Sequence, residues 1–169
     1  MRGALALALL AGLSACVSTA GRTPGAGAAA DFDVARFFEG ATQGRGTLKI
    51  VFQGREEVRV AGRGRVEDGV IILDQTVWRG ERAAETRQWR LRADGAGRLS
   101  GTLSDAAGPV SGAVEGNVLH LRFSMNGGVK ADQWLTLQPG GARVENVMVM
   151  RKFGLPVARL DEVILRVGE

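Results

Sequence analysis

The chain contains a single histidine, and its neighbours decide whether a histidine-based catalytic site can be predicted from the sequence. His120 falls in an alternating apolar stretch, where it shares a face with Arg122 and lies opposite Leu121. No Asp or Ser is fixed beside it, so a structural role is favoured, while a triad assembled by the fold stays open. The nucleophile-elbow, zinc-protease and phosphate-loop motifs do not occur. The residues therefore predict no catalytic residue, no metal site and no cofactor.

Two of the three tryptophans are candidates for the wall of a ligand cavity. Trp89 shares its face with Leu91, whereas its neighbours in the chain are polar, so we expect Trp89 to lie in the core. Trp134 shares its face with Lys130 and Asp132, which predicts a partly polar environment. Such an environment is typical of an indole that lines a cavity and can hydrogen-bond through its N–H group, and equally of an indole at a barrel corner.

The only cysteine stands at the end of a predicted export signal. A positive charge at Arg2 is followed by the apolar run Ala4–Ala11, which is too short to span a bilayer, and by Leu13-Ser14-Ala15. The residue that follows, Cys16, resembles the lipidated cysteine of a bacterial lipobox, which implies diacylglycerol on its thiol and cleavage in front of it. The alternative is a soluble secreted protein with an incidental thiol, but an unpaired exposed cysteine is a liability in an oxidising compartment.

The segment after this cysteine predicts a tether between a membrane and a folded domain. It is mostly Gly, Ala, Ser, Thr and Pro, which favours a flexible chain. We therefore divide the chain into a signal peptide (1–15), a tether that begins with the lipidated Cys16 (16–30) and a folded domain (31–169). Several acyl chains suffice for stable anchoring, so the membrane is an expected partner. Because Val17 is not an aspartate, the sorting logic of diderm bacteria favours the outer membrane, with the domain facing the periplasm.

The composition is that of one globular domain, with 45% apolar and 24% charged residues among 169. A single cysteine excludes an internal disulfide, and one cysteine with one histidine excludes a structural zinc site. The formal net charge of +4 is weakly positive, and no basic cluster is interleaved with stacking aromatic residues. Nucleic acid is therefore not an expected partner.

The folded domain is predicted to begin with one short helix and to continue entirely in strands. Asp31 is a candidate N-cap, apolar residues follow at helical spacing, and Gly40 ends the helix. From Thr47 onward apolar and polar residues alternate with a period of two, which is typical of half-buried strands. The predicted strands are residues 47–53, 58–66, 70–79, 86–93, 98–104, 109–115, 118–125, 129–138, 143–152 and 159–167.

Short connections rich in turn residues set the expected topology. Asp68-Gly69, Asn126-Gly127 and Pro139-Gly140 are hairpin signals, and no connection is long enough for a parallel crossover. The sequence therefore predicts an all-β antiparallel up-and-down meander. Closure into a lipocalin-like (calycin-type) barrel of about 8–10 strands would remove both edges, and the helix would cover one end. A β-sandwich or a long curled sheet stays the alternative.

Six short motifs are spread along the folded domain. They are Phe37-Phe38-Glu39-Gly40, Gln88–Leu91, Gly97–Asp105, Gly116–Leu119, Asp132–Trp134 and Arg151–Gly154. In order and spacing they resemble a family of bacterial lipoproteins, the domain of unknown function 3833, over nearly all of residues 36–167. The resemblance implies an envelope lipoprotein of unassigned activity, genetically associated with enzymes that modify membrane fatty acyl chains. The candidate ligand-binding residues are Trp89, Asp105, Asp132, Trp134, Lys152 and Phe153.

Three functions are compatible with these observations. The first is a noncatalytic, membrane-tethered module whose barrel binds an apolar ligand such as a fatty acyl lipid, with Met125, Met148 and Met150 as an adaptable lining. The second is an isomerase or hydrolase acting on modified fatty acyl lipids, which needs convergent polar groups in a pocket. The third is a structural or assembly lipoprotein that acts through an exposed apolar patch. The lipid-binding module is the leading hypothesis.

Overall fold

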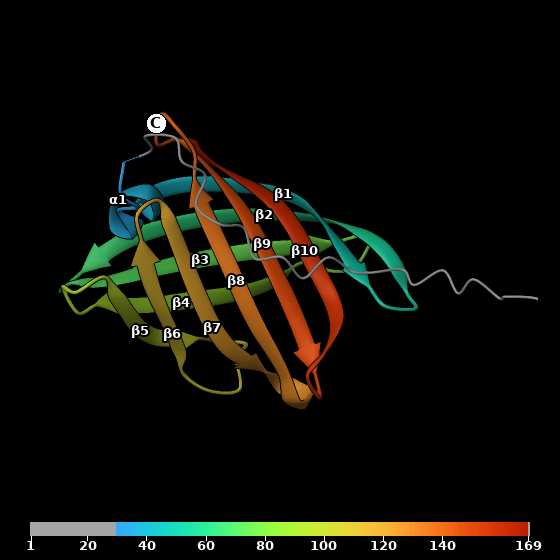
Figure 1. The fold of residues 1–169 in the computed structure, drawn as a ribbon. Coiled ribbons are helices and arrows are strands. Elements are labelled where there is room, and N and C mark those ends of the chain that lie inside the picture. Colours follow the sequence, from blue (N-terminus) through green and yellow to red (C-terminus); the bar gives the residue numbers. More distant parts are fainter. Residues whose placement is uncertain (1–29, 169) are drawn as a thin grey trace, which may run out of the picture.

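A computed structural model describes residues 30–168, so the predicted signal peptide, Cys16 and nearly all of the tether lie outside the described residues. In the described part, one α-helix is followed by ten antiparallel strands that close into a barrel (Figure 1). The elements are α1 Val34–Phe38, β1 Gly40–Ile50, β2 Gly54–Glu67, β3 Val70–Arg79, β4 Glu85–Ala93, β5 Arg98–Leu103, β6 Val110–Glu115, β7 Val118–Met125, the 3-10 helix η1 Asn126–Gly128, β8 Val129–Leu137, β9 Arg143–Lys152 and β10 Leu155–Val167.

Each strand pairs with the next one along the chain, and the first strand also pairs with the last. The seam between β1 and β10 is a continuous antiparallel ladder from Ala41 opposite Val167 to Ile50 opposite Ala158. The predicted meander and its closure into a barrel are confirmed, and the alternatives of a sandwich or an open curled sheet are wrong. Because every strand within residues 30–168 has two neighbours, this barrel has no free edge to pair with another chain.

β1 begins at Gly40, well ahead of the predicted start at Thr47, because glycines bring it close to β10. A Cβ at Gly44 would overlap the carboxyl group of Glu162, and a Cβ at Gly46 would overlap the backbone of β10. Glycine is depleted in strands, so the first half of β1 has no strand signal in the sequence. In the barrel the close approach of the two strands requires it.

The helix is shorter than predicted, and its N-cap is Asp33 rather than Asp31. The carboxylate of Asp33 accepts a hydrogen bond of 3.0 Å from the backbone N–H of Arg36. Asp31 lies outside the helix, where its backbone carbonyl accepts from the N–H of Asp33, so the predicted cap is wrong. No helix in residues 30–168 is long and apolar enough to cross a membrane.

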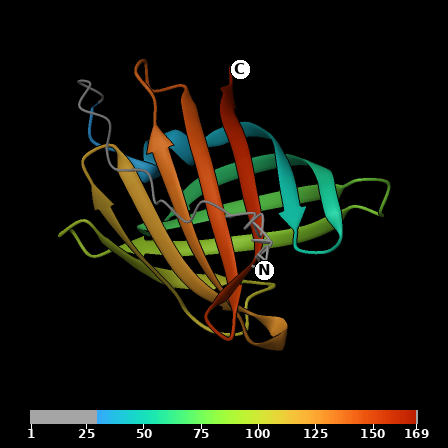
Figure 2. The ribbon, with the colours of Figure 1, turned by 45° about the vertical axis from the view of Figure 1, so that its right-hand side comes forward.

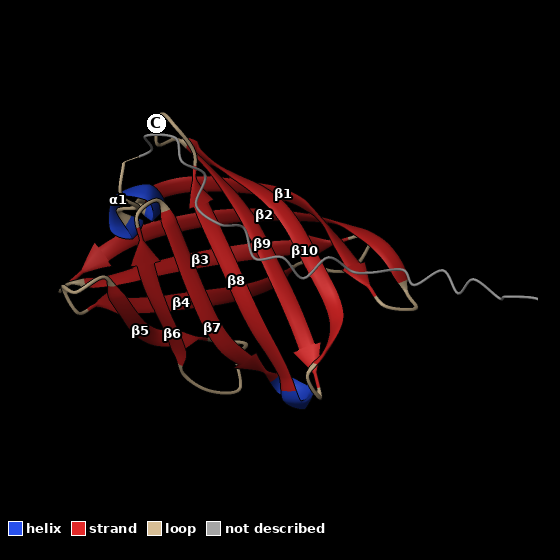
Figure 3. Ribbon diagram, in the orientation of Figure 1, coloured by secondary structure: helices blue, strands red, loops and turns tan. Residues whose placement is uncertain are grey.

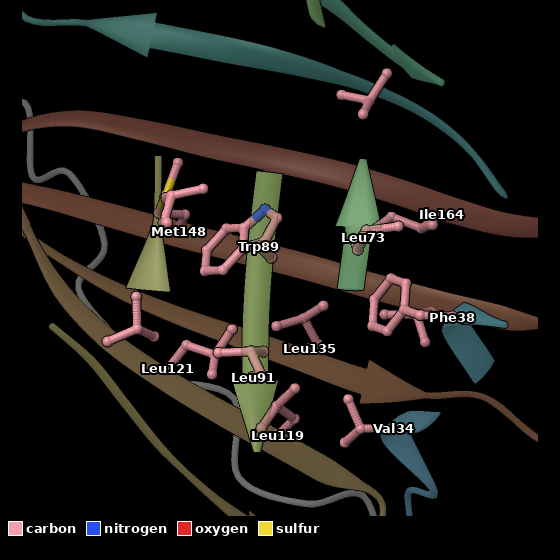
Figure 4. Close-up of a cluster of buried hydrophobic side chains, with 14 of the residues drawn as sticks. Val34, Phe38, Leu73, Trp89, Leu91, Leu119, Leu121, Leu135, Met148 and Ile164 are labelled. Atoms are coloured by element: carbon pink, nitrogen blue, oxygen red, sulfur yellow. The ribbon is translucent and has the colours of Figure 1, made fainter. Parts of the chain in front are cut away.

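The helix lies at one end of the barrel (Figure 3), and three phenylalanines of this region belong to the apolar core there. Phe32, Phe37 and Phe38 are buried, and successive rings meet edge to face with centroids 5.7 and 4.9 Å apart. The backbone carbonyl of Phe38 lies against Gly64 of β2, where any Cβ would overlap it. Figure 4 shows side chains of the helix reaching into the same apolar core as those of the strands.

The opposite end of the barrel is formed by the five turns at residues 51–53, 80–84, 104–109, 126–128 and 153–154, and we call this end the rim. Because neighbouring strands run in opposite directions, every second connection turns here, away from α1 (Figures 1 and 2). The other turns lie at the helix end. The barrel therefore has two chemically different ends.

The apolar core lies inside the barrel and is continuous from the helix through all the strands. Buried side chains such as Leu73, Leu91, Leu119 and Ile164 point inward and alternate with polar side chains that point outward. The helix, the ten strands and this core all lie within residues 30–168. That part of the chain therefore forms one closed barrel around a single core.

Candidate functional site

A cavity of about 150 Å³ lies inside the barrel toward the rim. Arg79, Glu85, Thr86, Arg87 and Asp105 form its polar side. It is smaller than the roughly 300–1,000 Å³ of pockets for drug-sized ligands, and similar in size to an engineered apolar cavity that binds benzene. It therefore has room for a small apolar group or for one end of an acyl chain. The apolar lining is Leu48, Val58, Val60, Val77, Met125, Met148, Met150 and Leu160.

Several polar side chains point into the barrel interior. Five of them we call the polar belt: Gln75, Arg87, Gln133, Asn146 and Glu162. Nε2 of Gln133 donates to Oδ1 of Asn146 over 3.0 Å, and Nδ2 of Asn146 donates to Oε2 of Glu162 over 2.7 Å. These three side chains are buried. A buried network of polar side chains lowers stability wherever one of its atoms lacks a hydrogen-bond partner. Its presence therefore indicates a functional role.

Arg87 connects the polar belt to the cavity, since it lines the cavity while its Nε donates to Oε1 of Gln75 over 2.8 Å. The same oxygen accepts the indole N–H of Trp89 over 2.9 Å, and the guanidinium carbon lies 5.8 Å from the centroid of that indole. Burial lowers the pKa of Arg87, and attraction to Asp105 and Glu162 opposes this shift. Arginine stays protonated in proteins, so the cavity holds a fixed cation. Among the described residues, only Nε of this guanidinium has a hydrogen-bond partner.

Glu162 is a carboxyl group with 8% exposure inside the barrel. Its Oε1 has no hydrogen-bond partner in the described part of the chain. Burial raises the pKa of Glu162, while the hydrogen bond from Asn146 and the charge of Arg87 act in the opposite direction. Glu162 can therefore hold a proton inside the barrel, although it is not among the residues that line the 150 Å³ cavity.

Two of the sequence-predicted residues lie at or near the cavity. Trp89 is 5% exposed, points inward as predicted, and meets the ring of Phe123 edge to face with centroids 5.4 Å apart. Asp105 is an exposed residue of a rim turn and lines the polar side of the cavity. Trp89 thus positions Gln75 beside Arg87, and Asp105 places a negative charge at the mouth.

Two other predicted residues, Asp132 and Trp134, lie together on the outer face of the barrel with His120. The ring of His120 stacks on Trp134 with centroids 4.7 Å apart and planes 6° apart. Nε2 of His120 is 3.2 Å from Oδ1 of Asp132, and Arg151 donates to the other oxygen over 2.8 Å. Among the described residues no hydroxyl group is hydrogen-bonded to His120, so the fold assembles a His–Asp pair without a nucleophile. This cluster faces away from the cavity.

The remaining predicted residues, Lys152 and Phe153, lie at the rim where β9 turns into β10. Both are exposed, and Nζ of Lys152 is 5.8 Å from the centroid of the Phe153 ring. The six candidates therefore fall in three places: the cavity, the outer face and the rim. The described residues bring no three His, Cys, Asp or Glu side chains together in a way that could hold a metal ion.

The polar belt is the part of the site that the sequence analysis missed. Its signal was present, because Glu162 alternates with Leu160 and Ile164 and so occupies a core-facing position. Asn146 and Gln133 also stand between buried apolar residues of their strands. A polar residue at a core-facing position is the pattern that could have identified the belt.

A family model described as a protein of unknown function (DUF3833) matches residues 10–166, which takes in Cys16 and nearly the whole barrel. No curated protein matches the chain.

Proposed function

The chain belongs to the DUF3833 family, and we propose that it is a lipid-anchored protein of the bacterial envelope whose barrel binds a fatty acyl ligand with an anionic head. The observation that carries this proposal is the cavity, in which an apolar wall with three methionines adjoins the fixed cation of Arg87. Unbranched, polarisable methionine side chains adapt to a flexible apolar chain. A guanidinium with unused N–H groups is suited to a carboxylate or phosphate oxygen.

The size of the cavity restricts the ligand. A volume of about 150 Å³ cannot enclose a long-chain lipid, so only one end of the ligand lies inside the barrel. The acyl segment would contact Met148 and Met150, and its anionic group would pair with Arg87. Glu85 and Asp105 on the same polar side would repel a second negative charge, which favours a singly charged head.

Attachment to the membrane is the second part of the proposal. Cys16 follows Leu13-Ser14-Ala15 as in a lipobox, and the family match includes this segment. The lipidated cysteine would hold the barrel at the periplasmic face of the envelope, with the outer membrane favoured over the inner. Metabolic labelling with an alkyne analogue of palmitate tests this part: label should enter the native chain but not the Cys16→Ser variant. Label in both would disprove anchoring through Cys16.

An enzyme acting on the same lipids is the second candidate, and Glu162 is the observation that favours it. Its carboxyl group has a raised pKa and an unpaired Oε1, as expected of a group that exchanges a proton. A noncatalytic role is preferred because Glu162 is hydrogen-bonded within the belt and does not line the cavity. Conversion of a bound acyl ligand that stops in Glu162→Gln would establish catalysis instead.

The ligand-binding proposal is tested with the chain from residue 17 onward, which keeps every described residue. Native mass spectrometry of protein purified from its own host without detergent should find a stoichiometric acyl ligand. Calorimetric titration with decanoate and decanol then separates the contribution of the apolar wall from that of the Arg87 cation. Arg87→Met should weaken decanoate binding by about tenfold or more and decanol binding much less, because only the carboxylate uses the cation.

Matched variants make the result specific. Arg90→Met removes an exposed arginine from the outer face of the same strand and should leave decanoate binding unchanged. Met148→Trp fills the cavity and should abolish binding of both ligands. An empty native protein that binds neither probe, or binding that survives Met148→Trp in a folded protein, would disprove the proposed site.

A further inference from the structure

The rim carries large apolar side chains that no part of the described chain covers. Phe52 and Phe153 stand at two turn tips with exposures of 103% and 92%, and Leu155 is 69% exposed beside the second tip. Val51, next to the first tip, is 38% exposed. Fully exposed phenylalanines cost solubility, so a pair of them at one end of a barrel calls for a binding partner.

The two hairpins that carry these tips are adjacent across the barrel seam. β1 and β10 form the barrel seam, with Ile50 opposite Ala158, and the backbone N–H of Val51 donates to the carbonyl of Val157 over 2.9 Å. The β1–β2 and β9–β10 hairpins therefore project from the rim side by side. The exposed apolar side chains on these two adjacent hairpins are together called the rim patch: Val51, Phe52, Phe153 and Leu155.

The backbone shows that stability does not explain the phenylalanines. Phe52 and Phe153 have φ of 65° and 53°, in the left-handed region that bulky residues avoid. At the helix end, the β2–β3 turn has the same two positive φ values in succession as the Phe153-Gly154 turn, but with Asp68 at φ 50° followed by a glycine, which is a favoured pair for such a turn. Where that turn has aspartate, the rim has phenylalanine at a conformational cost, as is typical of residues retained for binding.

Positive charge surrounds the rim patch. All three lysines of the chain, Lys49, Lys130 and Lys152, lie near strand ends at the rim, and Arg55 is the second residue of β2, beside the first tip. These four side chains are exposed, and among residues 30–168 none is within ion-pair distance of a carboxylate. Segments 49–55 and 151–159 contain no acidic residue. The acids elsewhere on the rim are Glu56 and Glu85, which pair with arginines, and the exposed Glu57, Glu81 and Asp105.

We infer that the rim patch docks on the surface of an anionic lipid bilayer. Projecting aromatic tips fit an interface into which they can insert, and unpaired lysines around them match the negative headgroups. The side chains of the rim patch stand on exposed turn tips, which favours insertion into a bilayer over binding of a peptide or a helix. Charge complementarity and the exposed tips both favour the bilayer.

Docking by the rim would also orient the cavity. Met125 and Met150, which line it, belong to strand segments that end at the rim, so its polar mouth and the rim patch lie at the same end of the barrel. A docked barrel would have its cavity facing the lipid. This surface does not depend on a ligand, because Phe52, Phe153 and the lysines lie outside the cavity lining.

The test uses the chain from residue 17 onward, which has no lipid anchor and no cysteine. Flotation with vesicles that mix phosphatidylglycerol and phosphatidylcholine should recover the protein, and vesicles of phosphatidylcholine alone should recover much less. Added salt should weaken the binding, because the Debye length falls from about 10 Å at 0.1 M to about 3 Å at 1 M. Phe52→Ser with Phe153→Ser should lower recovery by at least about tenfold.

A fluorescent label defines which end of the barrel touches the vesicle. Gln53→Cys and Ala96→Cys each introduce a single thiol, the first at the rim and the second in an exposed turn at the helix end. A nitrobenzoxadiazole label should brighten on vesicle binding at position 53 and not at position 96. Val66→Ser, which removes an exposed apolar side chain from the helix end, is the control for the serine variants.

Three results would overturn the inference. The protein does not float with anionic vesicles, or it floats equally well after both phenylalanines are replaced, or the label at position 96 responds as strongly as the label at 53. Circular dichroism of each variant establishes that it is folded. The outcome is separate from ligand binding, because Met148→Trp should block decanoate without changing flotation.

Discussion

Asn146 donates a hydrogen bond of 2.7 Å to Oε2 of Glu162 inside the barrel, while the other oxygen of that carboxyl has no partner in the described residues. Burial of a carboxyl group in this position costs less free energy for the neutral acid than for the anion. The interior of the barrel therefore favours a protonated glutamic acid. Folding stability and pH are therefore linked through this one side chain.

Glu162→Gln should change how stability depends on pH. Burial raises the pKa of Glu162 above its ordinary value of 4.5, so above that pH the unfolded chain releases a proton that the folded chain retains. Folding stability then falls as pH rises from 4.5 to the folded-state value. Urea unfolding measures the free energy of unfolding of both proteins. Relative to the native chain, Glu162→Gln should become more stable as pH rises across this range.

Asp74 is the control for this prediction, because it should act with the opposite sign. Hydrogen bonds from Gln88 and Arg65 lower the pKa of Asp74, so its contribution is lost as pH falls through the folded-state value. Against Asp74→Asn, the native chain should gain stability as pH rises through the acid range. If Glu162→Gln and Asp74→Asn gave the same slope, the proposed protonation of Glu162 would be wrong.

Gly64→Ala should destabilise the barrel by about 1–3 kcal/mol. A Cβ at this position would overlap the carbonyl of Phe38, so the helix must shift and its phenylalanines must move out of their packed positions. Gly108→Ala is the matched control, since no atom lies within 4 Å of a Cβ there. Urea unfolding should separate the two variants, and equal midpoints would contradict the role given to Gly64.

Phe153→Asn should stabilise the fold while it weakens binding to anionic vesicles. Phe153 and Gly154 both have positive φ, and Asn-Gly is the favoured pair for such a turn. Relief of the strain should raise stability by about 0.5–2 kcal/mol, measured by thermal unfolding. Asp68→Asn, at the comparable turn of the helix end, should alter neither property, and a less stable Phe153→Asn would contradict the interpretation of strain.

Asp132→Ala should lower stability without affecting the ligand. It removes the partner of His120 and Arg151 on the outer face, at a cost of about 0.5–1 kcal/mol for a partly exposed ion pair. Because this cluster faces away from the cavity, decanoate affinity should match that of the native chain. A large loss of affinity with the fold intact would move the ligand site to the outer face.

The fold was predictable because alternation and turns act locally. The period of two identified the strands, and the glycine-containing turns identified their antiparallel connection. The first half of β1 was not predictable, since Gly44 is explained only by Glu162 on a strand at the other end of the sequence. The same limit applies to the site: alternation assigns Glu162 and Asn146 to the inner face, but only the register between strands brings them into contact.

The convergence of His120, Asp132 and Arg151 illustrates the same point from the outer face. These residues lie on three adjacent strands, and register places Trp134 opposite His120. Sequence motifs selected Asp132 and Trp134 correctly as neighbours of one another, but grouped them with Trp89, which points inward. A list of motif residues carries no information on which side of a barrel wall each one lies.

The seam between β1 and β10 also determines the order in which the protein can be completed. The first and last strands are partners, so the barrel cannot close until β10 has been synthesised, and its closing contacts have a large sequence separation. Until then β1 and β9 each expose an unpaired edge, which is prone to pair with other chains. A chain that stops before Leu155 would therefore present both edges permanently and should aggregate, which makes intact synthesis of the C-terminus a condition for solubility.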